Sequence, residues 1–374
     1  MVQAQLTRSR APLVALSILA LLAGRWAGLV RLGWGLPALR PTLPAAHGAL
    51  MVSGFLGTLV SLERAVALRL RWTYLASLAT ALGALLLAGL PDWPGPLLIT
   101  LGSLGLVAIF AVIVRRHPAP YTRTMASGAV CWLVGNALWL LGRPVYQVVF
   151  WWAAFLILTI AGERLELSRV LRPPRRAWIL FLITLAIFGV GLLLSVPLPD
   201  FGLRLAAIGM LGLAAWLMRY DIARRTVRQT GLTRYIALCL LAGYIWLAIG
   251  GSLVWMFAGA MAGPLYDAML HPIFLGFVMS MIFGHVPIIF PAVLGVPMAF
   301  RPSFYIHLVL LHSSLALRIL GDLAGWPEVR QWGGLLNVLA VLLFLASMLY
   351  AIRQLARAAQ PASSSLPAQG PGRL

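Results

Sequence analysis

Two histidines stand where an ionisable side chain is unexpected, because each lies just inside the start of a long apolar run. His47 opens a run that ends near Leu62, and His271 opens one that ends near Leu294. A polar side chain within a membrane segment is costly and by default indicates function. Imidazole is also the commonest metal ligand among side chains. If both lie at equal depth on different helices, they could hold one flat metal cofactor between them.

The composition is that of a protein whose main solvent is the lipid bilayer. Of the 374 residues, 61% are hydrophobic and only 10% are charged, whereas about a quarter of the residues in soluble domains are charged. The 29 basic residues, all arginine, exceed the 9 acidic ones and give a net charge of +20. In so apolar a chain this excess indicates basic cytoplasmic loops rather than nucleic-acid binding. No C-x-x-C-H motif occurs, which excludes covalently attached c-type haem.

A helix needs about 20 apolar residues to cross the hydrocarbon core of a bilayer. The chain is therefore expected to be an all-α polytopic membrane protein with twelve transmembrane helices. They form one domain, residues 1–358, followed by a disordered tail, residues 359–374, rich in proline, serine, glycine and alanine. The predicted spans are 11–30, 44–62, 73–90, 96–114, 124–142, 145–162, 177–196, 201–218, 235–258, 268–294, 303–320 and 333–352.

The arginines predict the orientation of these helices. With the N-terminus inside, 22 of the 29 arginines fall on the inner side and 7 on the outer side. Basic residues favour cytoplasmic loops, so both termini are expected to be cytoplasmic, in a bacterial-type inner membrane. The outer arginines are Arg25, Arg31, Arg40, Arg143, Arg204, Arg318 and Arg330.

This topology makes His47 and His271 level partners. Helices 2 and 10 both run from outside to inside, and each carries its histidine about one turn from the outer end. Two neutral imidazoles are suitable axial ligands for a low-spin haem iron, for example in haem b. Gly48 would leave room beside the ring plane, and Phe274 and Met279 would supply an apolar wall. The alternative is that each histidine is an ordinary interfacial hydrogen-bonding residue.

A resemblance favours the ligand interpretation. The stretch His47-Gly48-Ala49-Leu50-Met51 resembles the H-G-x-x-M opening of helix 2 in subunit I of haem–copper oxidases, where this histidine ligates the low-spin haem. The segment from His271 to Phe290-Pro291 resembles helix 10 of that family, which carries the opposite ligand. The NnrS family, similar twelve-helix haem proteins linked to nitric oxide stress, is an equally good comparison. Both imply three arcs of four helices around the haem.

The departures from the oxidase pattern concern the copper site. The oxidases carry H-x-H on helix 10, whereas Met269 stands two residues before His271 here. The stretch Phe150–Phe155 replaces their H-P-E-V-Y motif on helix 6, and helix 7 has no histidine. Oxygen reduction at a haem–copper pair is therefore not expected. NnrS-like proteins also lack the copper centre, so these departures favour that comparison.

A second polar group lies toward the predicted inner side. Because 14 residues make almost four α-helical turns, His285 should face the same way as His271, about 21 Å deeper at about 1.5 Å per residue. The pairs Glu63-Arg64 and Glu163-Arg164 close helices 2 and 6, and such pairs at helix ends are most often interfacial salt bridges. The alternatives are a second metal or haem site, or a proton or quinol site. The residues considered for this site are Glu63, Glu163, Glu166, His285, His307 and His312.

Two further expectations concern function. Arg40, the closest to His47 in sequence, and the neighbouring Arg25 and Arg31 could pair with haem propionates, although contact with lipid phosphate explains them equally well. The expected role is redox or nitric-oxide-related, with a quinol or another redox partner. The alternative function is a transporter of a small solute, metal or protons that uses the intramembrane His/Glu cluster. A lipid-acting enzyme ranks last, because the chain has no H-E-x-x-H or G-x-S-x-G signature.

Overall fold

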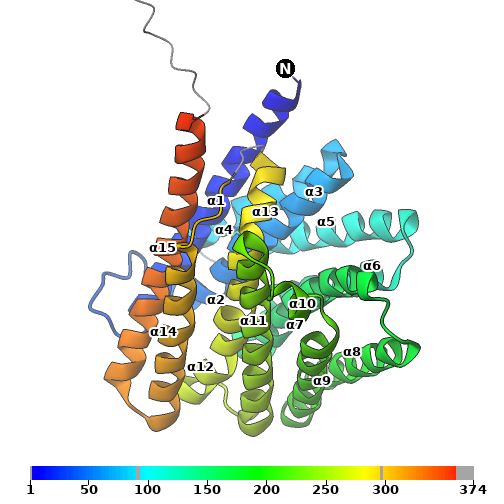
Figure 1. Ribbon diagram of the computed structural model, residues 1–374. Coiled ribbons are helices and arrows are strands. Elements are labelled where there is room, and N and C mark those ends of the chain that lie inside the picture. The colour runs from blue at the N-terminus through cyan, green and yellow to red at the C-terminus, as the bar shows by residue number, and fades with distance from the viewer. Residues whose placement is uncertain (1, 90–92, 295–297, 359–374) are drawn as a thin grey trace, which may run out of the picture.

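The protein is a bundle of helices that pack mainly against their neighbours in the sequence (Figure 1). The computed structural model describes residues 2–89, 93–294 and 298–358, and no β-strand occurs in these ranges. The predicted tail, residues 359–374, lies outside them. The elements are α1 (Val2–Arg31), η1 (Leu43–Ala46), α2 (His47–Ala49), η2 (Leu50–Gly57), α3 (Thr58–Leu68), η3 (Arg71–Thr73), α4 (Tyr74–Gly89), α5 (Pro94–Arg116), α6 (Pro120–Leu140), α7 (Val145–Ser168), η4 (Arg169–Leu171), α8 (Arg175–Leu194), α9 (Pro199–Tyr220), α10 (Ala223–Thr226), α11 (Gly231–Phe257), α12 (Gly263–His271), η5 (Pro272–Met279), α13 (Ser280–Leu294), α14 (Phe304–Ala324) and α15 (Pro327–Ala358).

Eleven helical segments in the described part of the chain are long and apolar enough to cross a membrane. They confirm a polytopic, all-helical membrane protein and coincide with eleven of the twelve predicted spans. The remaining predicted span, 124–142, is also helical, but α6 does not belong to this apolar set. It carries Arg123 and Asn136 together with several hydroxyl residues. A total of twelve membrane crossings therefore stays a prediction.

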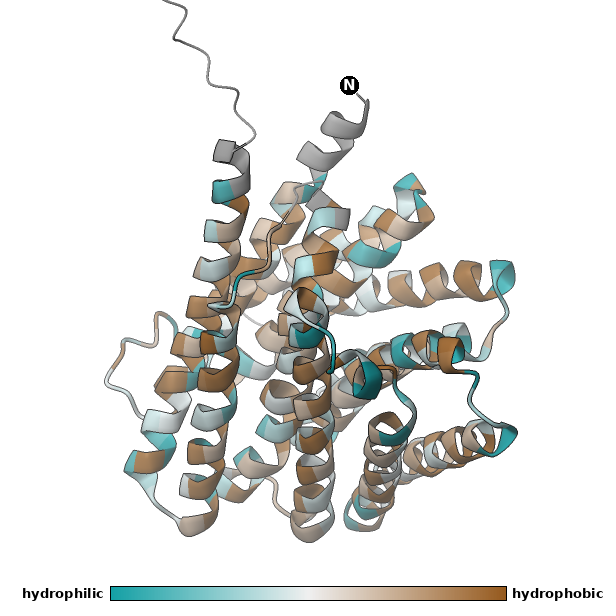
Figure 2. Ribbon diagram, viewed as in Figure 1, coloured by the Kyte–Doolittle hydropathy of each residue, from teal (hydrophilic) through white to brown (hydrophobic). Residues whose placement is uncertain are grey.

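The surface of the bundle is apolar along its length, as contact with lipid requires. Leu182, Leu193 and Val309 are each more than half exposed, and hydrophilic residues gather at helix ends and loops (Figure 2). A soluble protein rarely exposes apolar side chains in such numbers. By contrast, α7 lies at the centre, where 78% of its most apolar stretch is buried, against 28% for α8. Of the candidate spans, the one that contains α7 is therefore the most deeply buried.

Asn136 explains why α6 is polar in its interior. Its side-chain oxygen accepts hydrogen bonds from Trp152 Nε1 at 2.9 Å and Ser53 Oγ at 3.3 Å. Trp132 Nε1 in turn donates to Ser53 Oγ at 3.0 Å. This buried network joins α6, α7 and η2, and it holds the helix that begins at His47 against the centre of the bundle. Polar side chains between membrane helices stabilise such contacts when their partners are satisfied.

Replacing Asn136 by leucine should therefore destabilise the protein. The indole of Trp152 and the hydroxyl of Ser53 would both lose an acceptor in a buried position, at a cost of about 1–2 kcal/mol. Reversible unfolding in mixed detergent measures the change. Ser127→Ala is the matched control on the same helix, because that exposed hydroxyl bonds only to the carbonyl of Arg123 in the preceding turn. Equal stability of the two variants would contradict the assigned role of the network.

Both histidine-bearing segments contain a π-helix directly after the histidine. In the first, η2 covers Leu50–Gly57, and in the second, η5 covers Pro272–Met279. Pro272 has no N–H to offer the carbonyl of Ala268, which disturbs the α-helical ladder at the start of η5. π-Helices are rare and frequent at functional sites. Their wider turn also shortens the rise per residue, so the expected 21 Å between His271 and His285, which assumed an unbroken α-helix, is an overestimate.

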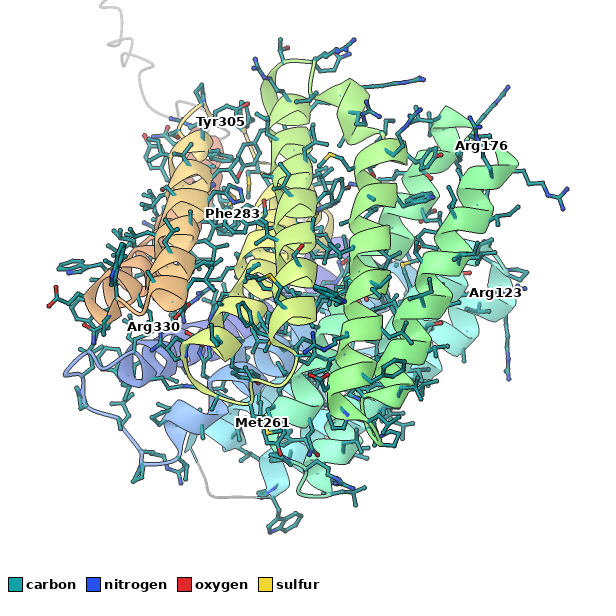
Figure 3. The ribbon with its side chains drawn as sticks, turned by 90° about the horizontal axis from the view of Figure 1, so that it is seen from below. Arg123, Arg176, Met261, Phe283, Tyr305 and Arg330 are labelled. Atoms are coloured by element: carbon teal, nitrogen blue, oxygen red, sulfur yellow. The ribbon has the colours of Figure 1, made fainter. Side chains whose placement is uncertain are left out.

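The two ends of the bundle differ in the residues that they carry. Figure 3 shows Arg176 and Tyr305 toward one end and Met261 and Arg330 toward the opposite one. We refer to these as the Arg176 end and the Met261 end. The chain places His47 and His271 near the Met261 end, because the α11–α12 connection that contains Met261 directly precedes α12.

Candidate cofactor site

His47 and His271 line one cavity, which we call the histidine cavity. It has a volume of about 360 Å³ and lies between α1, α2–η2, α7, α12–η5, α14 and α15. Small-molecule and cofactor sites typically measure about 300–1,000 Å³. Two residues that are 224 positions apart (271 − 47) thus share a wall of the same site. Convergence of this pair is the arrangement that a shared ligand requires.

The hydrogen bonds of the two rings leave the same nitrogen free. His47 Nδ1 lies 2.6 Å from the carbonyl oxygen of Gly24, and His271 Nδ1 lies 2.9 Å from that of Asp267. A carbonyl oxygen can only accept, so each Nδ1 donates and each Nε2 keeps its lone pair. This pattern, with one nitrogen anchored to backbone and the other free, is that of metal-ligating histidines.

The packing around His47 is shaped by small residues. A Cβ atom on Gly28 would lie 3.0 Å from Cε1 of the His47 ring, so the close approach of α1 requires glycine there. Gly48 faces the indole of Trp152 at a distance that would be ordinary contact for a side chain. Phe274 and Met279, expected as an apolar wall, do line the cavity. The space is therefore apolar in its interior, with the two imidazoles among its polar groups.

Four arginines line the histidine cavity: Arg25, Arg31, Arg318 and Arg330. The sequence pointed to the first two as possible propionate partners, whereas Arg318 and Arg330 were counted only as outer arginines. The third expected partner, Arg40, is not among the described residues that line the cavity. Proximity to His47 in the sequence was misleading here, because the segment between α1 and η1 carries Arg40 away from the cavity wall.

Asp267 organises part of this arginine group. Its Oδ2 accepts from Arg318 at 2.6 Å and from Arg330 at 3.1 Å, and Arg330 also pairs with Asp322 at 2.7 Å. Its backbone carbonyl holds the His271 ring. Asp267 is the one aspartate among the described lining residues and Asp322 pairs with Arg330 from outside the lining, so arginine exceeds aspartate and the charge around the cavity is positive. The site is thus prepared for a ligand that carries negative charge.

Arg25 is the strongest sign of a missing anionic partner. Its residue is only 6% exposed, and its Nε and Nη2 atoms have no hydrogen-bond partner among the described residues. A buried charge without a partner costs several kcal/mol. Guanidinium groups bind carboxylates with paired hydrogen bonds. A carboxylate of a bound molecule would therefore satisfy both the charge and the orphaned donors of Arg25.

The inner polar group forms salt bridges, though not the two equivalent pairs that the sequence suggested. Arg64 donates to Glu163 and lies 3.3 Å from Glu63, so one arginine serves two carboxylates. Arg164 instead pairs with Asp221, with Arg164 Nε and Asp221 Oδ2 3.1 Å apart and both side chains buried. Burial raises the pKa of Asp221 above its usual range, while the positive charge of Arg164 acts in the opposite direction.

His285 joins this inner salt-bridge group, whereas His307, His312 and Glu166 do not. Its Nδ1 donates to the carbonyl of Met281 at 2.7 Å, and Arg164 Nη1 lies 3.4 Å from its Nε2. His307 instead bonds to the hydroxyl of Tyr235 at 3.0 Å within an aromatic cluster. His312 accepts from Trp246 Nε1 at 2.9 Å.

Glu166 is exposed rather than turned toward His285. The structure thus divides the six candidates for the inner site among four places. In the described part of the chain, no three metal-ligating side chains gather in a group that could hold an ion.

These features define an all-helical integral membrane protein with a cationic cavity closed by two histidines. Residues 10–353 match a family described as a domain of unknown function (DUF8744). The match spans most of the chain, so the chain belongs to this family. No curated protein matches the chain.

Proposed function

We propose that the protein binds haem in the histidine cavity, with His47 and His271 as the two axial ligands. The observation that carries this proposal is that both rings line one cavity and both keep Nε2 free. A haem iron held by two imidazoles is six-coordinate and low-spin, and it supplies one-electron redox chemistry. The proposed role is accordingly in electron transfer or the response to nitric oxide.

The charge of the cavity supports a dianionic ligand such as haem b. Its two propionates would pair with this excess positive charge, one of them at Arg25 and the other at the Arg318–Asp267–Arg330 group. The apolar faces of a macrocycle would match Phe274, Met279 and the small residues around His47. A ligand without carboxylates would leave Arg25 buried and unpaired.

The resemblance to NnrS-like and haem–copper proteins supports the same assignment and excludes oxygen reduction from it. Helices 6 and 7 lack the histidines that hold copper in the oxidases, and Met269 replaces the extra haem ligand. We propose twelve membrane helices in three arcs of four, with α6 as the least apolar crossing. We further propose a bacterial-type inner membrane and cytoplasmic termini, which place the histidine cavity near the outer face. Four of the seven outer arginines line the cavity, and Arg204 lies within α9, so only Arg40 and Arg143 lie in connections between helices.

A visible spectrum of the purified full-length protein tests the proposal. Protein produced with ample haem supply should show a sharp reduced α-band and a low-spin ferric signal. A colourless preparation that still fails to take up added haem would overturn the assignment.

A further inference from the structure

We infer that a second cavity, near the Arg176 end, is a binding site for a hydroquinone with an apolar tail. This glutamate cavity has a volume of about 110 Å³ and lies between α1, η2, α3, α7, η5 and α13. Glu63, Glu163 and His285 line one part of it, and nearly all its other lining residues are apolar. The inference does not depend on the presence of haem in the histidine cavity.

The hydrogen-bonding character of the walls selects a ligand that donates. Carboxylates only accept, and Glu63 and Glu163 share the single counterion Arg64. His285 uses its N–H on the carbonyl of Met281, so its Nε2 is an acceptor, and Arg164 Nη1 already lies 3.4 Å from that atom. The hydroxyl of Thr159 is also committed, since it donates to the carbonyl of Phe155 at 2.7 Å. With both glutamates ionised, acceptors are therefore in excess among the described lining residues and no side-chain donor is free.

The charge balance excludes an anion and fits neutral hydroxyl groups. Two glutamates against one arginine leave one negative charge at the polar end, and the ion pair of Arg164 with Asp221 behind His285 is neutral overall. An added carboxylate or phosphate would be repelled here. A phenolic O–H can donate to a carboxylate in a short, strong hydrogen bond.

The size and openness of the cavity fit one ring with a tail. A closed apolar cavity of about 150 Å³ accommodates a benzene ring, so a volume near 110 Å³ excludes a macrocycle and admits a single ring only after a small adjustment of the lining side chains. Leu59, Ile282 and Ile289 line it and are only half-buried, so one side opens toward lipid and leaves room for a tail. Leu56 lines both cavities, so the ring would lie one side-chain layer from the histidine cavity.

Binding of a decyl-substituted hydroquinone, measured by calorimetry on the purified full-length protein under anaerobic conditions, tests the inference. The oxidised quinone and decylbenzene are the comparison probes, because they carry the same tail but no O–H donor. We expect the hydroquinone to bind about tenfold more tightly than either. Glu163→Gln should reduce that preference about tenfold, and Val286→Phe, which fills the cavity without changing charge, should abolish binding of all three.

Asp200→Asn is the matched control, because that carboxylate lies on the surface of α9 and pairs only with Arg204. It should leave all three affinities unchanged. Equal affinity for the three probes, or a bound phospholipid that the hydroquinone cannot displace, would overturn the inference. The same hydroquinone titration on haem-free protein tests the two proposals separately. If the protein binds the hydroquinone but takes up no added haem, only the haem proposal is refuted.

Discussion

Replacing either His47 or His271 by alanine is expected to abolish the low-spin spectrum and to lower haem content at least about tenfold. Loss of a hydrogen-bond partner of a metal ligand alone typically costs about 10- to 100-fold in metal affinity, and loss of the ligand should cost no less. The two single variants should behave alike, because both rings line the same cavity and expose the same nitrogen.

The remaining histidines provide the controls for this experiment. His117 is exposed in the loop between α5 and α6, so His117→Ala should leave the spectrum unchanged. His285→Ala should also preserve it, because that ring lines the glutamate cavity instead. In a His47→Gly variant, added imidazole should restore the low-spin signal by entering the vacated space. A low-spin spectrum that persists in both alanine variants would move the ligands to other residues.

Much of the fold was predictable, because hydropathy and arginine placement report directly on the bilayer. The positions of eleven spans follow from runs of about 20 apolar residues. The weakest prediction concerned α6, because its polarity has a tertiary cause. The side-chain oxygen of Asn136 accepts from Trp152 and Ser53, which belong to other helices. A count of apolar residues cannot distinguish such a buried acceptor from an exposed asparagine.

The histidine pair was predictable for a similar reason, since depth along a membrane helix can be counted in residues. The group of arginines around the pair was not predictable. Arg318 and Arg330 meet Arg25 only because α14 and α15 pack beside α1 and α12, a contact between distant parts of the chain. Arg40 shows the opposite error, in which closeness in sequence was taken for closeness in space.

The inner group shows where periodicity failed. Glu163 and Glu166 are three residues apart, a spacing that places them on one helix face, and both were candidates for the inner site, yet Glu166 is exposed while Glu163 binds Arg64. His307 and His312 lie in the first half of α14. His307 is hydrogen-bonded to Tyr235 and His312 to Trp246, so neither joins His285. Residue type and depth alone could not separate a ligand from a buried histidine that is already hydrogen-bonded. The sequence also has no pattern that predicts the two π-helices, apart from Pro272 at the start of η5.

The arrangement of charge distinguishes the two cavities by the ligands they would accept. The histidine cavity has an excess of arginine over aspartate and an orphaned guanidinium, whereas the glutamate cavity, with both glutamates ionised, has one carboxylate in excess and no free side-chain donor in its described lining. An anionic macrocycle and a neutral hydroxylated ring would therefore be sorted between them by electrostatics as well as by volume. Leu56, which lines both, brings the two sites close to each other.

Replacing Arg25 by methionine is expected to change the stability of the protein in opposite directions with and without its ligand. Without haem, the substitution removes an unpaired buried charge and should raise the free energy of unfolding by about 2 kcal/mol. With haem, it removes the partner of a carboxylate and should weaken haem binding about 10- to 100-fold. Equilibrium unfolding of the haem-free protein and haem titration measure the two effects separately.

The matched control is Arg143→Met, since that arginine is exposed in the α6–α7 connection and should change either quantity little. If Arg25→Met destabilised the haem-free protein, the guanidinium would have a partner already. Unchanged haem affinity would mean that the propionates lie elsewhere. A gain in stability coupled to a loss of affinity has a single physical explanation: Arg25 is kept in an unfavourable place because the bound molecule brings the anion that it lacks.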